Sequence, residues 1–388
     1  MKILLISPLP PKGGGMGAVA GSLLGHALKS PNGISWITCD TTHRLRPETS
    51  LNHGVRIITG ITNSLSAVTR SWNLVNHGKP DLIHLNSSAS LALLRDLLIV
   101  AMARKYGLPV VIHWHFGRIP ELMQKHGWEW RLLRHVIRKC NHSIVIDEKS
   151  LVLLQHAGFR NVSYIPNPLG EDIVGQYAGL RHENGLRKPQ RILYAGHIIP
   201  QKGVFELVEA CAQISDVNEL ILAGHYESGI RQSLEAVARH RHGGLWLRFT
   251  GPLPQNEVLR LMRTAPIFVL PSYTEGFPMV VLEAMAMGCA VVSTNVGAIP
   301  QMLTSDLEKP CGICIPDHSV KTLSHALKGL LDHPGEISIL GENARTFVLR
   351  NFSMEMVFPA FEQVWKSVLP DNGQITNEWI VKQNMAAV

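Results

Sequence analysis

The stretch from residue 267 to residue 297 constrains the fold of this chain most. It begins with Ile267-Phe-Val-Leu270, a short apolar run rich in β-branched residues, the pattern of a strand buried in a parallel sheet. Glu275-Gly-Phe-Pro278 then turns the chain into a helix whose first residue is predicted to be the proline. Gly288 caps the helix, and Ala290-Val-Val-Ser293 forms the next strand. This succession of strand, turn, helix and strand predicts an α/β protein.

The turn in this stretch has the features of an anion-binding site. The backbone amides from Phe277 to Val280 lie at a helix N-terminus, where N–H groups have no partner within the helix. Glu275 precedes these amides and Glu283 follows inside the helix; ionised carboxylates accept hydrogen bonds from hydroxyls. A ligand with a diphosphate and sugar hydroxyls would satisfy all these groups. The structural alternative is a helix with one acidic turn residue and one solvated glutamate.

The rest of the chain repeats the alternation of strands and helices twice, which predicts two doubly wound, Rossmann-like domains. We expect domains over 1–170 and 188–350, and a segment 351–388 with a final helix (354–368) and a loosely ordered tail. The polar stretch 181–190 is the expected linker. In the first half the expected strands are 2–7, 34–39, 55–58, 82–85, 110–115, 143–146 and 162–165. In the second half they are 191–194, 220–222, 245–249, 267–270, 290–293 and an edge strand at 312–315.

Composition places the chain among globular proteins. With 388 residues, 45% hydrophobic and 17% charged, it is long enough for two or three domains. The six cysteines show no disulfide-framework spacing, which favours a reducing compartment and a cytoplasmic protein. The first apolar run is too short for a signal peptide, and the longest one, 91–103, is interrupted by Arg95 and Asp96, so no transmembrane span is expected.

The net charge of +7 is distributed unevenly between the two halves. Residues 1–170 contain 19 Lys or Arg and 8 Asp or Glu, a net charge of +11, whereas the remainder is net −4. Such a basic half predicts an anionic partner such as lipid, nucleic acid or an acidic glycan.

The residue sequence of the 275–300 stretch resembles that of a known family. Glu275-Gly-Phe-Pro, Leu282-Glu-Ala-Met-Ala and Val291-Val-Ser-Thr-Asn-Val-Gly-Ala-Ile-Pro together resemble the signature of the retaining GT-B glycosyltransferases of family 4, which carry an E-x7-E motif. The resemblance implies two facing Rossmann-like domains and a C-terminal helix that crosses back to the first. It also implies transfer of a sugar from a nucleotide-sugar, UDP- or GDP-linked, to a hydroxyl of a glycan or glycolipid acceptor. That activity leaves no role for nucleic acid among the possible partners.

A second loop extends the resemblance. In Gly196-His-Ile-Ile-Pro-Gln-Lys202-Gly203, Lys202 matches a lysine that holds the donor diphosphate in the family. His197 stands where the family usually has arginine, and a neutral imidazole offers one donor where guanidinium offers a charged fork. The donor-diphosphate site implied by the resemblance therefore comprises His197, Lys202, Gly276, Phe277, Pro278, Met279 and Val280.

The resemblance also assigns roles to the remaining site residues. Glu275 would bind donor-sugar hydroxyls, Glu283 the nucleotide ribose, and His115 the sugar from the first domain. His113 is the alternative histidine, because alternate residues of a strand face the same way. Glu275, His115 and Lys202 are the expected catalytic residues. The chain contains no Asp-x-Asp metal motif, so no metal is expected on the diphosphate.

Glycines after the first strand support two interpretations. Gly14, Gly15 and Gly17 resemble the family loop that lines the site near the sugar and the acceptor. The same glycines, with Asp40 at the end of the second strand, also fit a dinucleotide-binding turn imperfectly, because residues 8–12 intervene. The structural alternative is a flexible turn.

Two further motifs have competing interpretations. Cys311-Gly-Ile-Cys314 is a lone C-x-x-C, for which a redox or zinc role would need a second element. The segment 124–140 is predicted to form an amphipathic helix with tryptophans at its start. It is either an ordinary helix with a solvated basic face or a helix that contacts the anionic inner face of the plasma membrane. The residues expected at that membrane surface are Trp128, Trp130, Arg131, Arg134, Arg138 and Lys139.

Two other activities remain open. A sugar-nucleotide epimerase or phosphorylase would share the fold, since a fold does not determine function. An inactive nucleotide- or glycan-binding homologue would explain His197. Turnover of donor without acceptor would indicate the first, and donor binding without transfer would indicate the second.

Overall fold

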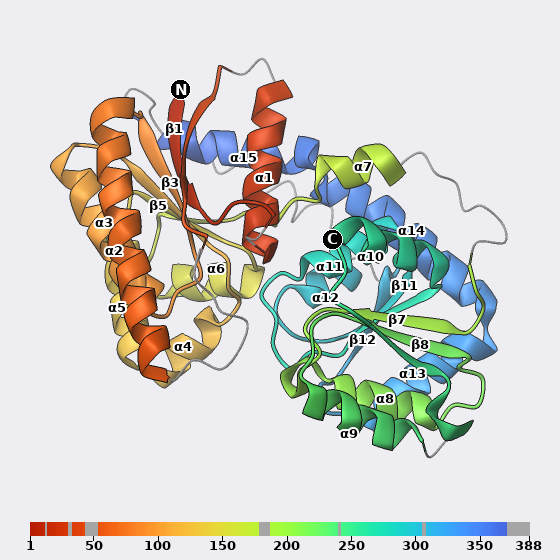
Figure 1. Cartoon of the computed structure of the whole chain (residues 1–388). Helices are drawn as coiled ribbons and strands as arrows, with labels where there is room; N and C mark the ends of the chain where they lie inside the picture. The colour runs from red at the N-terminus through yellow and green to blue at the C-terminus, as the bar shows by residue number, and fades with distance from the viewer. Residues whose placement is uncertain are drawn as a thin grey trace. The chain divides into compact units, whose positions relative to one another are not determined.

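The computed structural model describes residues 1–11, 14–29, 33–42, 53–177, 187–239, 242–304 and 308–370. The predicted linker 181–190 lies mostly outside these ranges, and the predicted tail 371–388 lies entirely outside them. The described chain forms two compact units. The first unit contains residues up to Gly170 and the segment from Met354 onward, and the second contains Glu171–Ser353 (Figure 1).

The first unit is built on a six-stranded parallel sheet. Its strand order is β2-β1-β3-β4-β5-β6, and every neighbouring pair is parallel. The interior strands are buried over nearly their whole length, as the apolar runs of the sequence predict. The strands are β1 (Lys2–Ser7), β2 (Ser35–Asp40), β3 (Leu82–Ser87), β4 (Val110–Trp114), β5 (His142–Val145) and β6 (Val162–Tyr164).

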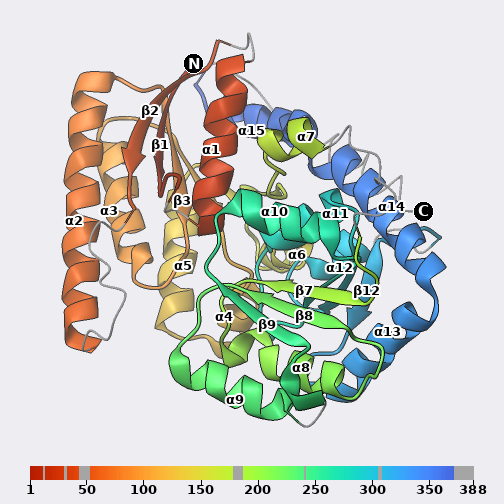
Figure 2. The same ribbon diagram turned by 45° about the vertical axis from the view of Figure 1, so that its right-hand side comes forward.

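Helices cover both faces of this sheet (Figure 2). The connections β2–β3, β3–β4 and β4–β5 all progress in one direction, so right-handed crossovers place α2, α3 and α5 on one face. The return from β1 to β2 places α1 on the opposite face, where α15 packs beside it. The helices are α1 (Gly14–Lys29), α2 (His53–Gly78), α3 (Ala92–Lys105), α4 (Ile119–Lys125), α5 (Trp128–Lys139), α6 (Glu148–His156) and α15 (Met354–Ser367).

The second unit repeats this architecture with a sheet of order β12-β11-β10-β7-β8-β9. Gly312–Ile315 forms the edge strand, as predicted. The strands are β7 (Arg191–Ala195), β8 (Glu219–Ala223), β9 (Leu247–Gly251), β10 (Ile267–Leu270), β11 (Ala290–Thr294) and β12 (Gly312–Ile315). The helices are α7 (Glu171–Tyr177), α8 (Val204–Ala212), α9 (Ser228–Ala238), α10 (Gln255–Thr264), α11 (Met279–Ala286), α12 (Ile299–Leu303), α13 (Val320–Asp332) and α14 (Pro334–Phe352), with two short 3₁₀ turns, Pro200–Lys202 and His242–Gly244.

Three local predictions were wrong. The β-branched run 55–58 belongs to the long helix α2 (His53–Gly78), because the strand propensity of so short a run is weak and depends on its context. The predicted strand at 245–249 begins two residues later, at Leu247. Pro278 is the N-cap of α11 with extended backbone angles, so the helix begins at Met279.

The C-terminal helix α15 is part of the first unit and fills one face of its sheet. Trp365 and Phe361 are fully buried there, and the Trp365 ring packs edge-on against Trp36 of β2 at 5.4 Å between centroids. Phe358 of the same helix contacts His26 of α1 at 4.5 Å. The core of the first unit is therefore built from both ends of the described chain.

Candidate functional site

The candidate site in the second unit is formed by loops at the carboxyl ends of three adjacent strands. β11, β10 and β7 are neighbours in the sheet, and ligands of parallel α/β sheets bind beyond this end of the strands. The loop after β10 is tied to the other two by its backbone. The amide of Tyr273 donates to the carbonyl of Gln201 at 3.1 Å, and the amide of Ala298 donates to the carbonyl of Gly276 at 2.9 Å.

Two predicted site residues that are far apart in the sequence form an ion pair. Lys202 Nζ lies 2.6 Å from Glu275 Oε1, and both side chains are largely shielded from solvent. The pair joins the loop after β7 to the loop after β10. Within this unit the structure thus brings together the predicted diphosphate-binding lysine and the predicted sugar-binding carboxylate.

Two glycines allow these loops to approach so closely. Gly203 has a φ of +66°, and a Cβ atom there would lie 2.0 Å from the carbonyl oxygen of Pro271. Gly297 has a φ of +57°, and a Cβ atom there would lie 2.3 Å from the carbonyl oxygen of Glu275. Only glycine satisfies both the left-handed backbone and the missing space. These glycines fix the position of the loop that carries Glu275.

The N-terminus of α11 lies directly after this loop. Pro278 is the N-cap, and the amide of Val281 bonds back to the Pro278 carbonyl at 3.0 Å. The amides of Met279 and Val280 occupy the two preceding positions of the first turn, which lack acceptors within a helix. Phe277 is buried against Phe352 at 5.7 Å between ring centroids and anchors the turn. The result is a rigid set of N–H donors next to Gly276 and Glu275.

Glu283 lies further along α11 and is buried. Its Oε1 accepts a hydrogen bond of 2.6 Å from Nε2 of Gln255, the first residue of α10. Burial raises the pKa of Glu283 to about 7, although the hydrogen bond from Gln255 favours the ionised form. The carboxyl group therefore titrates near neutral pH, unlike a solvated surface glutamate.

The raised pKa of Glu283 predicts a pH-dependent stability. A carboxyl group whose pKa is higher in the folded state stabilises the protein most below its ordinary pKa of 4.5, and this contribution is lost as the pH rises to about 7. We therefore compare the change in the free energy of unfolding that Glu283→Gln causes at pH 8 with the change it causes at pH 4. The change at pH 8 is expected to be more stabilising by about 2–3 kcal/mol. Urea unfolding at the two pH values measures this difference.

Glu257→Gln is the matched control for that experiment. Glu257 lies on α10 and pairs at the surface with Arg260 at 2.6 Å, so its replacement should have nearly the same small effect at both pH values. Equal responses of the two variants to pH would show that Glu283 does not titrate in the predicted range.

His197 follows β7, and its imidazole is exposed to solvent. The carbonyl of His197 accepts a 2.6 Å hydrogen bond from the hydroxyl of Tyr194, a buried residue of β7, which fixes the start of the loop. The His197 ring lies 6.4 Å from the ring of His225. A histidine at this position thus leaves an exposed imidazole on the loop that also carries Lys202.

The predicted histidines of the first unit lie in a row across β3 and β4. The ring centroids of His113 and His115 are 3.9 Å apart, which confirms that the two side chains lie on one side of the sheet. His113 is fully buried, 5.8 Å from the ring of His84 and 5.4 Å from that of Phe361. Burial keeps His113 neutral and lowers the pKa of His115 to about 3. His113 belongs to the core, so His115 remains the candidate site histidine.

A directional chain of hydrogen bonds begins at α15 and ends at the loop after β1. Trp365 Nε1 donates to His84 Nδ1 at 3.0 Å, which assigns the ring proton of His84 to Nε2, 3.1 Å from Asn86 Oδ1. Asn86 Nδ2 donates to Ser7 Oγ at 2.9 Å, and Ser7 Oγ donates to the carbonyl of Pro8 at 2.8 Å. The C-terminal helix is thereby connected to the start of the glycine-rich loop.

The glycine-rich segment itself opens α1. Gly14, at the start of α1, has a left-handed φ of +57°, Gly15 and Gly17 follow within the helix, and Gly17 packs near the backbone of Leu9. Asp40 accepts hydrogen bonds from the amides of Leu9 and Thr42 at 3.2 and 2.8 Å. Burial opposes ionisation of Asp40, but a hydrogen bond from the Thr42 hydroxyl and those from the two amides outweigh it and lower the pKa of Asp40. Asp40 thus stabilises the loop after β1, and the dinucleotide interpretation of this acid is not supported.

The C-x-x-C motif contains no disulfide. None of the six cysteines forms a disulfide, and burial raises the pKa of Cys314 to about 11, so this thiol of the C-x-x-C pair stays protonated at neutral pH. In the described ranges, His, Cys, Asp and Glu form no group of three placed to hold a metal ion. No helix in the described part of the chain has the length and hydrophobicity needed to cross a membrane.

One residue of the predicted membrane surface is placed differently. Trp130 is buried and packs against Phe159 at 6.5 Å between ring centroids, whereas Trp128 is 59% exposed. Trp130 shares its helix face with the buried residues Leu133 and Ile137 at spacings of three and seven, a signal that the sequence contains. Of the two tryptophans predicted for the membrane surface, Trp128 is therefore exposed as predicted and Trp130 is not.

Sequence reasoning missed two side chains that support the site. Gln255 contacts Glu283, as described above. Tyr273 donates from its hydroxyl to Glu206 Oε1 at 2.5 Å and stacks on His318 at 3.6 Å between centroids. No local pattern marks these residues, because each acts through a contact with another element.

Comparison with solved structures identifies the class of fold. The chain is similar to sucrose-phosphate synthase from Thermosynechococcus elongatus, with a TM-score of 0.74 at 19% identity over 96% of this chain and 100% of that one. It is also similar to HepE of Anabaena in complex with UDP, with a TM-score of 0.70 at 17% identity over 95% of this chain and 100% of that one. At these identities the similarity establishes the fold alone. Two Rossmann-like units of this kind define a glycosyltransferase fold of GT-B type.

Sequence comparison identifies the family. The model described as Glycosyltransferase Family 4 matches residues 13–171, and the model described as Glycosyl transferases group 1 matches residues 180–347. The chain belongs to this family of GT-B glycosyltransferases. It is 25% identical to a glycogen synthase of Mycobacterium tuberculosis over 76% of this chain and 69% of that protein. It is 34% identical to the putative teichuronic acid biosynthesis glycosyltransferase TuaC of Bacillus subtilis over 32% of this chain and 29% of that protein.

Proposed function

We propose that this glycosyltransferase moves a hexosyl group from a UDP- or GDP-sugar to a hydroxyl acceptor with retention of anomeric configuration. We propose as its acceptor a lipid-linked or cell-surface polysaccharide precursor or a glycolipid, used at the cytoplasmic face of a membrane. The observation that carries the proposal is the Lys202–Glu275 pair, 2.6 Å apart, in front of the N-terminus of α11. A cation and free amides suit a diphosphate, and a carboxylate suits sugar hydroxyls.

The proposed mechanism uses these groups to stabilise the leaving diphosphate. Negative charge develops on the leaving group as its bond to the sugar breaks, and fixed donors placed around this charge are a large source of catalysis. Lys202 and the first-turn amides of α11 would supply these donors, with His197 on the neighbouring loop. No metal is needed for this arrangement, so we propose that the donor binds without one.

Binding of the diphosphate would also release Glu275. The anion competes with Glu275 for Lys202 Nζ, because both are acceptors for the same ammonium group. Glu275, once separated from the lysine, would accept hydrogen bonds from the donor sugar and support the positive charge that develops on it. His115 of the first unit would contact the sugar as a neutral imidazole, which the low pKa imposed by burial permits.

Retention is proposed to proceed by front-face attack of the acceptor hydroxyl. In this route the acceptor oxygen forms a bond to the anomeric carbon as the bond to the diphosphate breaks, and the leaving phosphate oxygen takes the acceptor proton. Glu275 would act in this route as a hydrogen-bond acceptor for the sugar, and no side chain is proposed as a nucleophile. A covalent glycosyl-enzyme detected by mass spectrometry would contradict this route.

A thermal-shift screen with nucleotides tests the donor site. UDP, GDP, ADP and CDP and their common sugars are added to the purified protein with and without EDTA. A ligand at a hundredfold excess over its Kd stabilises the folded protein by about 2.7 kcal/mol, so one nucleotide should raise the melting temperature clearly. The shift is expected to be equal in EDTA and to be lost in Glu283→Ala, because Glu283 is proposed to bind the ribose.

Each other outcome of the screen has a defined meaning. Absence of a shift with every nucleotide would contradict the donor site and favour a homologue without this activity. A shift followed by conversion of the donor without any acceptor would indicate an epimerase or phosphorylase. Binding without transfer, even in His197→Arg, would indicate an inactive binding protein.

A further inference from the structure

The outer surface of the α2–α3–α5 layer in the first unit is unusually apolar. Seven of the twelve exposed large hydrophobic side chains in the described ranges belong to these helices or to the residues that cap α3. We call the exposed side chains of α2, α3 and α5 the outer helix face. The helices pack side by side in this order, and Figures 1 and 2 show them together on one face of the sheet. Apolar side chains gathered in this way mark an interaction surface.

The centre of the outer helix face is a stripe of leucines on α3. Leu91, Leu94 and Leu98 are spaced by three and four residues, so they lie on one line along the helix. They are 51%, 50% and 47% exposed. Ala101 and Lys105 continue the same line and are exposed as well. An ordinary solvated helix places polar residues along such a line.

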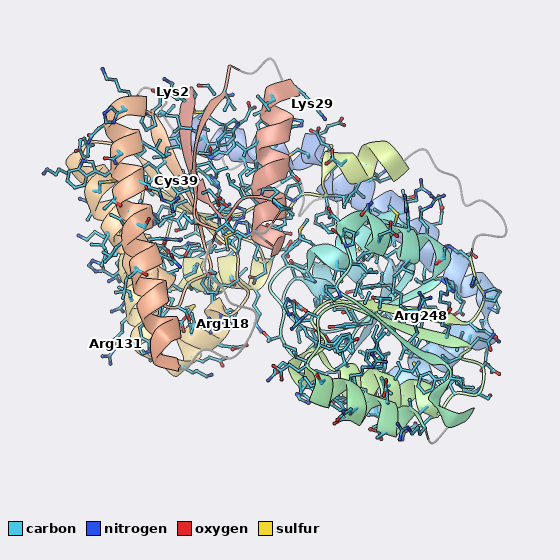
Figure 3. All side chains as sticks on the ribbon, viewed as in Figure 1. Lys2, Lys29, Cys39, Arg118, Arg131 and Arg248 are labelled. Carbon is cyan, nitrogen blue, oxygen red and sulfur yellow. The ribbon has the colours of Figure 1, made fainter. Side chains whose placement is uncertain are left out.

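Basic side chains flank this stripe on α5. Arg131, Arg134, Arg138 and Lys139 are all exposed, and Figure 3 labels Arg131 at the outside of this layer. The three helices contain only two carboxylates. Asp96 is fully buried and pairs with Arg95 at 2.7 Å.

Glu129, the second carboxylate, is also neutralised by its contacts. It accepts hydrogen bonds from Arg118 at 3.1 Å and from the amide of Ser90 at 2.9 Å. The outer helix face therefore has a positive charge with no exposed carboxylate on the described parts of its helices.

Aromatic side chains with both polar and apolar character stand beside the leucines. Trp128 begins α5 and is 59% exposed. Trp72 of α2 is exposed as well, packs edge-on against Tyr106 at 6.0 Å and lies below Lys105 Nζ at 5.9 Å. Tryptophan and tyrosine are enriched where a protein meets lipid headgroups.

We propose that the outer helix face docks on an anionic lipid bilayer. In this arrangement α3 lies in the plane of the interface with its leucines among the acyl chains, while the α5 arginines and lysine contact lipid phosphates. A protein partner would need polar contacts that fix its position along the helix, and a row of leucine side chains has no polar atom to provide them. A fluid bilayer needs no such fixed position. The docking proposal rests on the proposed function in one respect: docking would give the enzyme access to a lipid-linked acceptor.

Flotation of the full chain with lipid vesicles tests this docking. We expect binding to vesicles of phosphatidylcholine and phosphatidylglycerol, weak binding to phosphatidylcholine alone, and release at high salt. Leu94→Ser with Leu98→Ser should weaken binding about tenfold or more, because both side chains leave water on docking. Arg131→Gln with Arg134→Gln should also weaken it about tenfold or more, and should reduce the salt dependence.

Matched variants in the second unit separate docking from general stickiness. Leu245→Ser with Ile339→Ser replaces two exposed apolar residues, and Arg239→Gln with Lys321→Gln replaces two exposed cations; neither pair should change vesicle binding. All variants should keep the thermal shift given by nucleotide, so a failure of the donor site and a failure of docking are distinguishable. Equal vesicle binding by every variant would overturn the proposal.

Fluorescence measures the depth of docking and tests for a protein partner. Vesicles with brominated acyl chains should quench the wild-type chain more than Trp128→Phe, because Trp128 would lie at the headgroup level. If the leucine variants instead abolish a dimer in analytical ultracentrifugation and leave vesicle binding unchanged, the face binds a second copy of the chain and the lipid proposal is wrong.

Discussion

Lys202→Ala is expected to lower kcat by about a hundredfold to a thousandfold, the loss seen when one fixed donor to a developing negative charge is removed. Lys202 Nζ is the charged group closest to Glu275, 2.6 Å away, and Glu275 itself precedes the N-terminus of α11. The substitution also leaves Glu275 without its cation, so a carboxylate would remain unpaired beside the bound diphosphate. Steady-state kinetics with the donor found in the thermal-shift screen measure the effect.

The matched control for this prediction is Lys328→Ala. Lys328 is an exposed lysine of the same unit and pairs with Asp332 at 3.2 Å, so its loss should leave kcat within about twofold. Lys202→Arg keeps the charge with a different geometry and should recover part of the activity. If Lys202→Ala raised KM alone and left kcat unchanged, the lysine would bind donor and transition state equally and would not act in catalysis.

Gly203→Ala is expected to lower the stability of the second unit strongly. Its Cβ would lie 2.0 Å from the carbonyl oxygen of Pro271, and its φ of +66° is strained for any residue with a side chain. Relief requires a shift of the loop after β7 or the loop after β10, both of which carry site residues. We expect the free energy of unfolding to fall by about 3 kcal/mol or more, measured as a lower urea midpoint.

Gly107→Ala separates the two causes of this loss. Gly107 also has a φ of +66°, but a Cβ atom there would have no neighbour within 4 Å, so only the backbone strain of about 1–2 kcal/mol remains. If Gly203→Ala fails to fold, Gly297→Ala takes its place in the comparison with Gly107→Ala, because a Cβ atom at position 297 would lie 2.3 Å from the Glu275 carbonyl oxygen. Equal losses at positions 203 and 107 would mean that the contact with Pro271 does not hold the loops in place.

The local order of the chain could be predicted from sequence because its signals are local. The apolar run 267–270, the turn at Glu275 and the cap at Gly288 are each readable within a few residues, and β10, α11 and β11 follow them closely. The prediction of a strand at 55–58 was wrong because it too relied on a local signal alone. Its β-branched residues favour a strand locally, but the segment lies within the 26-residue helix α2, and such a local propensity is easily overridden.

The composition of the candidate site could be predicted only in part. Lys202 and Glu275 were identified singly by resemblance, but their ion pair joins residues 73 positions apart and depends on two glycines that allow close approach. The hydrogen bond from Gln255 to Glu283 crosses between two helices and has no sequence signature. Such contacts arise from tertiary packing, which no period or motif encodes.

The place of α15 in the first unit has a consequence for synthesis of the chain. Trp365 and Phe361 complete a core that begins with β1, and the entire second unit lies between them in the sequence. A ribosome-bound chain therefore presents β3 and β4 with one face uncovered, including buried His84 and His113, until residue 365 has emerged. The second unit, continuous in sequence from Glu171 to Ser353, can complete its core first, although it is made second.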